Sequence, residues 1–172
     1  MPTIDYLRPG LDLVFVGINP GMASEAAGRH YAGPGNHFWP LLHESGIVPE
    51  LLTYRNDERV LDFNIGMTNM VMRASRGLDD LTLEELKAGA EILREKLRLY
   101  APKVVCFNGK RIFEIYAGRR ASLGIQPREP GEPIYFVMPS TSPRGASYQR
   151  ADKLVFFRQL KELLDLERGE ST

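Results

Sequence analysis

The sequence predicts an α/β protein: a three-layer α/β/α sandwich around a short, mainly parallel sheet of four to five strands. Apolar runs of strand length alternate with helical patterns along the chain, the order that produces parallel strands joined by helices. The first and last of these runs are each followed at once by a loop rich in Gly, Pro or Ser. The 172 residues suffice for one domain, and we expect it to span 1–172 with its core at about 11–167.

Four segments are expected to form the strands. They are apolar and rich in β-branched and aromatic side chains, as strands buried on both faces require. They lie near Asp12–Val16, Gly66–Met72, Lys103–Phe107 and Ile134–Met138. Because parallel strands end at one edge of their sheet, the loops after them meet where open α/β sheets bind ligands.

Capping and periodicity signals predict the helices. Asn36 is a suitable N-cap, and Gly46 a suitable C-terminal stop, for a helix between them. Thr82 and Glu85 have the spacing of a capping box. We therefore expect helices near residues 37–45, 83–101, 110–116 and 151–167.

Composition limits the class of protein. The formal net charge is zero, which argues against a strongly basic nucleic-acid binder, yet residues 138–158 hold four basic side chains against one acidic. The single cysteine, Cys106, excludes an internal disulfide and a Cys-rich metal centre, and its apolar neighbours predict a buried strand thiol. No segment suits a membrane span or a signal peptide, so we expect a cytoplasmic protein.

The loop Gly17–Gly21, with the sequence GINPG, is the first candidate site. Its glycines let the backbone approach a ligand closely. The Asn19 amide can accept and donate hydrogen bonds but cannot titrate at neutral pH, so it suits a reaction that needs a held water rather than a strong nucleophile. Loss of a nucleobase through an oxocarbenium-like sugar is such a reaction. The alternative is a purely structural turn.

The segment 28–39 is dense in aromatic, histidine and glycine residues. Tyr31 can stack on an extruded base, an interaction worth about 1–3 kcal/mol. The alternative for Phe38 is a place in the core, and for His30 a structural hydrogen bond. With three histidines in the chain and no paired carboxylates, we predict no metal site.

Two asparagines, Asn64 and Asn69, flank the second expected strand. An amide facing the pocket can pair with the O4 and N3–H edge of uracil, because it offers both an acceptor and a donor. The alternative, above all for Asn64, is a capping or turn role.

The loop Met138–Arg144 follows the last expected strand and continues with small residues. Hydroxyl side chains and backbone N–H groups can hold phosphates. Arg144 at the tip is suited to fill the gap that an extruded nucleotide leaves in the base stack. The alternative is a solvated Ser/Pro loop.

Together these segments resemble the mismatch-specific uracil/thymine DNA glycosylases of the uracil-DNA glycosylase superfamily. The resemblance runs from about Leu13 to Leu164 and is closer to the thymine-DNA glycosylase branch, whose last motif also carries an arginine wedge. It rests on GINPG (17–21), HYAGPGNHFW (30–39), GMTNMV (66–71), FNGK (107–110) and MPSTSPRGASYQRADK (138–153), in that order.

The resemblance implies a uracil-DNA glycosylase-like fold and a role for each matched residue. Asn19 matches the catalytic asparagine that positions the water, Ser140 the phosphate-holding serine, and Arg144 the intercalating residue. The base pocket would consist of Gly17, Ile18, His30, Tyr31, Phe38, Asn64 and Asn69. DNA contacts would come from Lys110, Ser140, Thr141, Ser142, Arg144, Gly145, Ala146, Arg150 and Lys153.

The implied activity is base excision from double-stranded DNA with G:U or G:T mismatches, by a monomer without a cofactor. No aspartate lies beside Asn19 as a general base, and no lysine lies in the pocket motifs as a nucleophile. We therefore predict a monofunctional enzyme that removes uracil and does not nick the strand. Two alternatives stay open: a module that binds a free nucleotide through the GINPG loop, and a mismatch-binding protein that does not cut.

Overall fold

The computed structural model describes residues 3–143 and 148–169. Its five-stranded sheet has the order β2-β1-β3-β5-β4. Four strands are parallel to one another, and one short edge strand is antiparallel to its neighbour. The parallel strands are β1 (Leu13–Gly17), β2 (Ile65–Asn69), β3 (Val104–Asn108) and β5 (Ile134–Met138), and the edge strand is β4 (Gly124–Ile125). The four predicted strands are confirmed with small shifts at their ends, and β4 is an addition that the sequence did not indicate.

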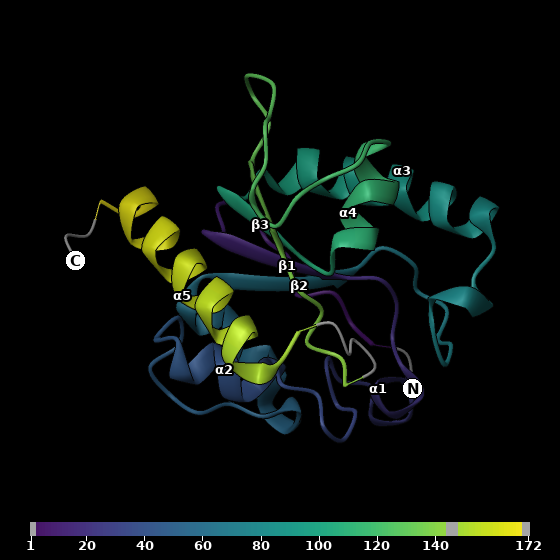
Figure 1. Ribbon diagram of the computed structural model, residues 1–172, viewed down its shortest axis with the longest axis horizontal. Helices are drawn as coiled ribbons and strands as arrows, with labels where there is room; N and C mark the ends of the chain where they lie inside the picture. Colours follow the sequence, from purple (N-terminus) through teal and green to yellow (C-terminus); the bar gives the residue numbers. More distant parts are fainter. Residues whose placement is uncertain (1–2, 144–147, 170–172) are drawn as a thin grey trace.

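Helices cover both faces of this sheet (Figure 1). One face carries α2 (Phe38–Glu44) and α5 (Arg150–Glu167), and the other carries α3 (Leu83–Tyr100) and α4 (Lys110–Ala117). The connections contain α1 (Met22–Ala27) and two 3-10 segments, η1 (Tyr54–Phe63) and η2 (Leu78–Asp80). The predicted three-layer α/β/α sandwich is therefore confirmed.

The sheet has a hydrophobic core on each face. On the α2 and α5 side, Phe15 packs edge-on against Phe38, with 4.9 Å between ring centres. On the other side, Phe107 meets Phe113 of α4 at 5.0 Å. Each fully buried phenylalanine contributes about 1.5–3 kcal/mol, so both layers hold the strands that carry the loops. Cys106 in β3 is buried, as predicted.

The predicted helix signals have clear counterparts. Thr82 and Glu85 form the capping box of α3, each side chain accepting from the backbone N–H of the other. The N-cap of α2 is His37, one residue later than the predicted Asn36, and Asn36 Oδ1 accepts from the backbone N–H of Phe38 at 3.0 Å. Gly46 has a φ of +83°, the left-handed conformation that glycine adopts without strain.

The amino-terminal segment is also part of the packed structure, although no sequence signal indicates it. Tyr6 pairs with Met67 of β2, and its hydroxyl donates to the buried carboxylate of Asp57 at 2.8 Å. Asp5 accepts from Lys96 of α3 at 2.6 Å. These contacts cover the β2 edge of the sheet and bring the segment toward the ends of the strands.

Candidate active site

A cavity of about 740 Å³ lies at the carboxyl ends of the four parallel strands. Each strand delivers a loop or its last residue to the wall, and the segment before α2 closes a further side. The two loops that follow β1 and β5 thus meet in one hollow, because only β3 separates these strands in the sheet. This is the place where open α/β sheets bind ligands.

Asn19 lies in this cavity with its amide orientation fixed. Its Nδ2 donates to the backbone oxygen of Arg73 and to Oγ of Ser75, both at 2.8 Å. Ser75 is buried and donates its own hydroxyl to the carbonyl of Gly77 at 2.8 Å. Because both amide hydrogens are used, Oδ1 is the atom of Asn19 that can accept a hydrogen bond from a water molecule.

Gly17, Tyr31 and Asn69 meet at the inner end of the cavity. A Cβ atom at Gly17 would lie 2.5 Å from Asn69 Oδ1 and 3.3 Å from the Tyr31 hydroxyl, so any larger residue there would force the Asn69 side chain to move. Tyr31 stacks on the ring of Phe38 with 4.2 Å between ring centres. Burial raises the pKa of Tyr31, so its phenol stays neutral. An amide and a hydroxyl beside an aromatic ring suit a planar, polar ligand.

His30 is held neutral at the cavity wall. Its Nε2 lies 2.6 Å from the carbonyl of Ile4, so Nε2 carries the hydrogen and Nδ1 is an acceptor. Burial lowers the pKa of His30 below its usual value. Its backbone N–H donates to Asp57 at 2.7 Å, and that carboxylate also accepts from Arg29 at 2.8 Å. This network fixes the backbone just before Tyr31.

The loop after β5, residues 140–143, is clamped to the end of β3. Asn108 Nδ2 donates to Thr141 Oγ1, and Asn108 Oδ1 accepts from the Thr141 N–H, both at 2.9 Å. The backbone N–H of His37 donates to the carbonyl of Thr141 at 3.1 Å. Thr141 is fully buried, while Ser140 and Ser142 remain at the cavity wall. We refer to residues 140–143 as the serine loop.

The charge around the cavity is of one sign. Among the described residues that line it there is no Asp or Glu, whereas Arg76, Lys110 and Arg111 do line it and are exposed. Lys110 and Arg111 open α4, whose amino-terminal dipole adds partial positive charge. The cavity therefore favours an anionic ligand and provides no carboxylate as a general base.

Most of the residues selected from the sequence line this one cavity. They are Gly17, Ile18, Asn19, His30, Tyr31, Asn69, Lys110, Ser140, Thr141 and Ser142. Arg144, Gly145 and Ala146 lie outside the described residues. Residues far apart in the sequence thus meet because the strands that carry them end at the same edge.

The other selected residues have different places. Asn64 ends η1 with a φ of +59°, and its Nδ2 donates to the carbonyl of Gly10 at the opposite end of β2, so its assignment to the base pocket is wrong. Phe38 is fully buried behind Tyr31 and supports the pocket from the core rather than lining it. The alternatives weighed for these two residues, a turn and a core position, are what the structure shows.

Two basic residues expected to contact DNA are engaged within the protein. Arg150 at the start of α5 forms an ion pair with Glu44 of α2, although its side chain remains 43% exposed. Lys153, one turn later, is buried beneath the serine loop. Neither position was apparent from the sequence, because helical spacing alone does not show which neighbour covers a side chain.

Ser75 and Asn108 are site residues that the sequence analysis did not select. Asn108 is the last residue of β3, within the FNGK motif, just as Asn69 is the last residue of β2. An asparagine at the end of an apolar strand could therefore have indicated this site residue from the sequence. Ser75 has no such signal, because it reaches Asn19 through the irregular segment after β2.

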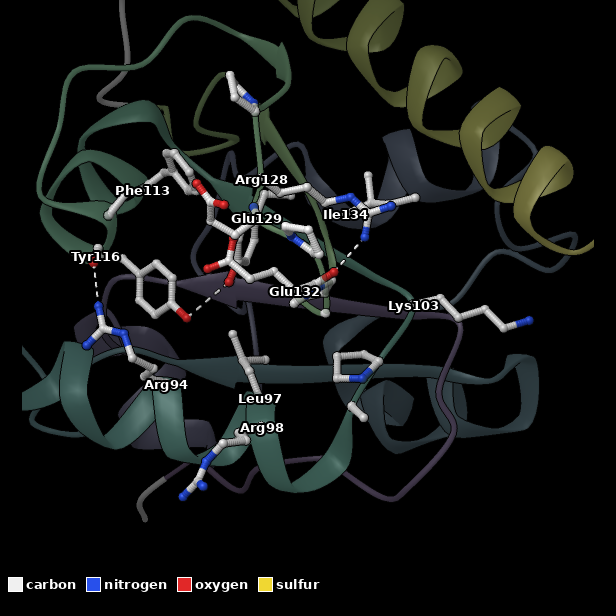
Figure 2. A pocket seen from close by; sticks show the side chains of 18 of the residues that line it. Arg94, Leu97, Arg98, Lys103, Phe113, Tyr116, Arg128, Glu129, Glu132 and Ile134 are labelled. Carbon is white, nitrogen blue, oxygen red and sulfur yellow. Dashed lines mark hydrogen bonds between the residues drawn. The ribbon is translucent and has the colours of Figure 1, made fainter.

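A second hollow, of about 1070 Å³, lies at the amino ends of β3 and β5 (Figure 2). Arg94 lies over the ring of Tyr116 and donates to its backbone oxygen at 2.8 Å. Arg94 is paired with Glu91 and Arg98 with Glu95, so the charge of these two arginines is compensated within the protein. This hollow is larger, but the described residues that line it include no Asn, Gln, Ser or Thr, the side chains that make the first one a candidate active site.

Two further observations concern the part of the chain that the structure describes. It contains no group of three or more His, Cys, Asp or Glu side chains that could hold a metal ion. It also contains no helix that is long and apolar enough to cross a membrane.

Comparison with known proteins identifies the family of the chain. The sequence profile of the Uracil DNA glycosylase superfamily matches residues 4–165. The chain belongs to this superfamily. Its members are DNA glycosylases. In this chain the cavity lies at the carboxyl ends of the parallel strands. A solution NMR structure of a candidate uracil DNA glycosylase from Methanosarcina acetivorans shares the fold, with a TM-score of 0.58 and 20% identity over 93% of this chain and 97% of that chain.

Proposed function

We propose that this superfamily member is a monofunctional DNA glycosylase that removes uracil opposite guanine and leaves an abasic site for base-excision repair. The observation that carries the proposal is the Asn19 amide, whose two hydrogens are held by Arg73 and Ser75 and whose oxygen remains as an acceptor. It lies in a cationic cavity in which no described lining residue is a carboxylate, as an anionic DNA substrate requires.

In this proposal Asn19 holds the water that completes the reaction. The glycosidic bond lengthens first, so the sugar gains oxocarbenium character and the pyrimidine leaves as an anion. Asn19 Oδ1 accepts a hydrogen bond from the water and presents its oxygen to the sugar carbon. A positioned water needs little activation against such a cation, so a non-titrating amide is sufficient. The cationic rim of the cavity favours the departing anion electrostatically.

The inner end of the cavity is the proposed base pocket. Asn69 offers an amide that can pair with the O4 and N3–H edge of uracil, and Tyr31 offers the aromatic face. Uracil is a better substrate than thymine in this scheme, because the thymine methyl needs extra space and its anion leaves less readily.

The proposed DNA contacts lie on the rim. Ser140 and Ser142 would hold a backbone phosphate, and Lys110 lines the same cavity. Arg144 would fill the gap left by the flipped nucleotide, and Gly145 and Ala146 would read the unpaired guanine. The motifs GINPG, GMTNMV and FNGK support placing the chain in the mismatch-specific branch near the thymine-DNA glycosylases.

The decisive experiment measures alkali-labile sites in a duplex that contains one G·U pair, without added metal or nucleotide. We expect the wild-type protein to produce such sites. Asn19→Ala should lower the single-turnover rate by about a thousandfold or more, because it removes the water-holding oxygen, while DNA affinity changes little. Asn56→Ala, which removes an amide in the cap of η1 away from the cavity, is the matched control.

Three outcomes would contradict the proposal. An intact G·U duplex at stoichiometric protein would point to a mismatch-binding protein. Equal loss of cleavage and binding in Asn19→Ala would show that Asn19 is structural. A DNA adduct trapped by borohydride would show a covalent mechanism, with Lys110 as the lysine at the cavity wall.

A further inference from the structure

Lys153 is a buried cation beneath the serine loop. It lies in the first turns of α5, and only 2% of its surface is exposed. Its Nζ donates to the carbonyl of Ser142 at 3.4 Å, a long hydrogen bond. No carboxylate of the described residues lies within 4 Å of it, whereas neighbouring Arg150 is paired with Glu44.

An ammonium group in this position is costly in the free protein. Moving a charge from water to a protein interior is unfavourable unless an opposite charge compensates it. Burial accordingly lowers the pKa of Lys153 below its usual value. His37 interacts electrostatically with Lys153. Its buried Nδ1 has no hydrogen-bond partner among the described residues. Burial lowers the pKa of His37, and the charges of Lys153 and Arg150 lower it further.

The loop above Lys153 is held in place by other contacts. The two bonds between Asn108 and Thr141 and the bond from His37 fix its backbone. The single long bond from Lys153 therefore adds little that the loop needs in order to keep its shape. The buried ammonium lowers the stability of the free protein, and the loop does not need it in order to keep its shape. An anionic ligand that binds beside it is the best explanation for its presence.

We propose that Lys153 is an electrostatic anchor for DNA, whose counter-ion is the backbone phosphate that docks on the serine loop. This inference rests on the proposed function, since it takes DNA as the ligand. The ammonium lies below Ser142 and acts through the loop, so Lys153 is a positioning residue rather than a catalytic one. In the buried setting its attraction to a phosphate is screened less by salt than that of a surface lysine.

The proposal predicts opposite effects on stability and on binding. Lys153→Met keeps the length and the apolar stem of the side chain and removes only the charge. In the absence of DNA, the variant should unfold at a higher urea concentration than the wild type, because an uncompensated buried charge is gone. Its affinity for duplex DNA should fall about tenfold or more, because the electrostatic attraction between the buried ammonium and the phosphate is lost.

The test uses an undamaged duplex, so that it does not depend on base excision. Dissociation constants are measured against salt concentration for the wild type, Lys153→Met and Lys87→Met, the last being an exposed lysine of α3. We expect the slope of log affinity against log salt to become shallower by about one unit in Lys153→Met alone.

Each result decides a separate point. Loss of both stability and affinity in Lys153→Met would show a structural lysine and overturn the proposal, as would unchanged affinity and slope. Failure of the wild type to excise uracil while these binding differences persist would refute the glycosylase and leave the phosphate anchor standing.

Discussion

The orientation of one amide decides the reactivity proposed for this site. Ser75 Oγ takes one hydrogen of Asn19 Nδ2, and the carbonyl of Arg73 takes the other. We predict that Ser75→Ala lowers the excision rate about ten- to hundredfold, because the amide can then rotate and the water is held less well. Single-turnover kinetics at saturating G·U duplex measures the effect.

The hydroxyl itself, rather than the space it fills, should matter. Ser75→Thr keeps the acceptor and should restore most of the rate. The DNA dissociation constant should stay within about twofold in both variants, since an interaction made chiefly in the transition state affects the rate rather than binding. A rate for Ser75→Ala equal to that of the wild type would show that Arg73 alone fixes the amide.

Individual residues differ in how well a sequence reveals them. Asn19 and Asn69 were selected because an apolar strand precedes each of them, and such strands end at the binding edge of the sheet. Asn64 carries the same side chain but precedes its strand, so it lies at the opposite end. Ser75 and Lys153 owe their roles to neighbours distant in sequence, which spacing cannot reveal.

At the scale of elements, the capping box of α3 is coupled to the active site. Glu85 caps α3 and also accepts from Arg73 at 2.8 Å, and the carbonyl of Arg73 holds Asn19. The Arg73 guanidinium, together with the Thr82 N–H, lowers the pKa of Glu85 to about 2. An unfolded glutamate has a pKa of about 4.3. The ionised Glu85 therefore stabilises the folded state fully above about pH 4.3, and this stabilisation is lost as the pH falls toward 2.

Glu85→Gln tests this coupling. The variant should be less stable than the wild type at pH 7, and the difference should shrink as the pH falls from about 4.3 toward about 2, as measured by urea unfolding at each pH. Excision at neutral pH should slow as well, because Arg73 loses its partner. A stability difference that does not depend on pH would mean that the ion pair contributes nothing to stability.

Elements were predictable where their signals are local. Strands, capping residues and helix stops follow from neighbouring residues, so the parallel strands and α3 appear close to their expected positions. β4 and the Tyr6 pairing with Met67 were missed, because two residues and one bridge leave no periodic pattern. Their stability comes from the sheet that they join.

At the scale of the whole molecule, the zero net charge conceals an uneven distribution. The cavity wall carries Arg76, Lys110 and Arg111, and no described residue of its lining is a carboxylate. At the second hollow, Arg94 and Arg98 are paired with glutamates. The formal net charge of zero argued against a nucleic-acid binder. A net charge is misleading here because it averages over the whole surface, including faces that the proposed DNA ligand would not contact. The local count from residue 138 to 158 did not locate this charge either, because Arg76, Lys110 and Arg111 lie outside that stretch.

This distribution predicts a modest salt dependence of DNA binding. Three rim cations and Lys153 would neutralise about four phosphates, so log affinity should fall against log salt with a slope of about −4. Between 50 and 200 mM salt the affinity for a duplex should then drop by roughly two orders of magnitude. Arg111→Gln should make the slope shallower by about one unit, and Arg128→Gln, at the second hollow, should leave it unchanged. A slope twice as steep, or one that responds to Arg128, would mean that DNA binds a wider face than the mouth of this cavity.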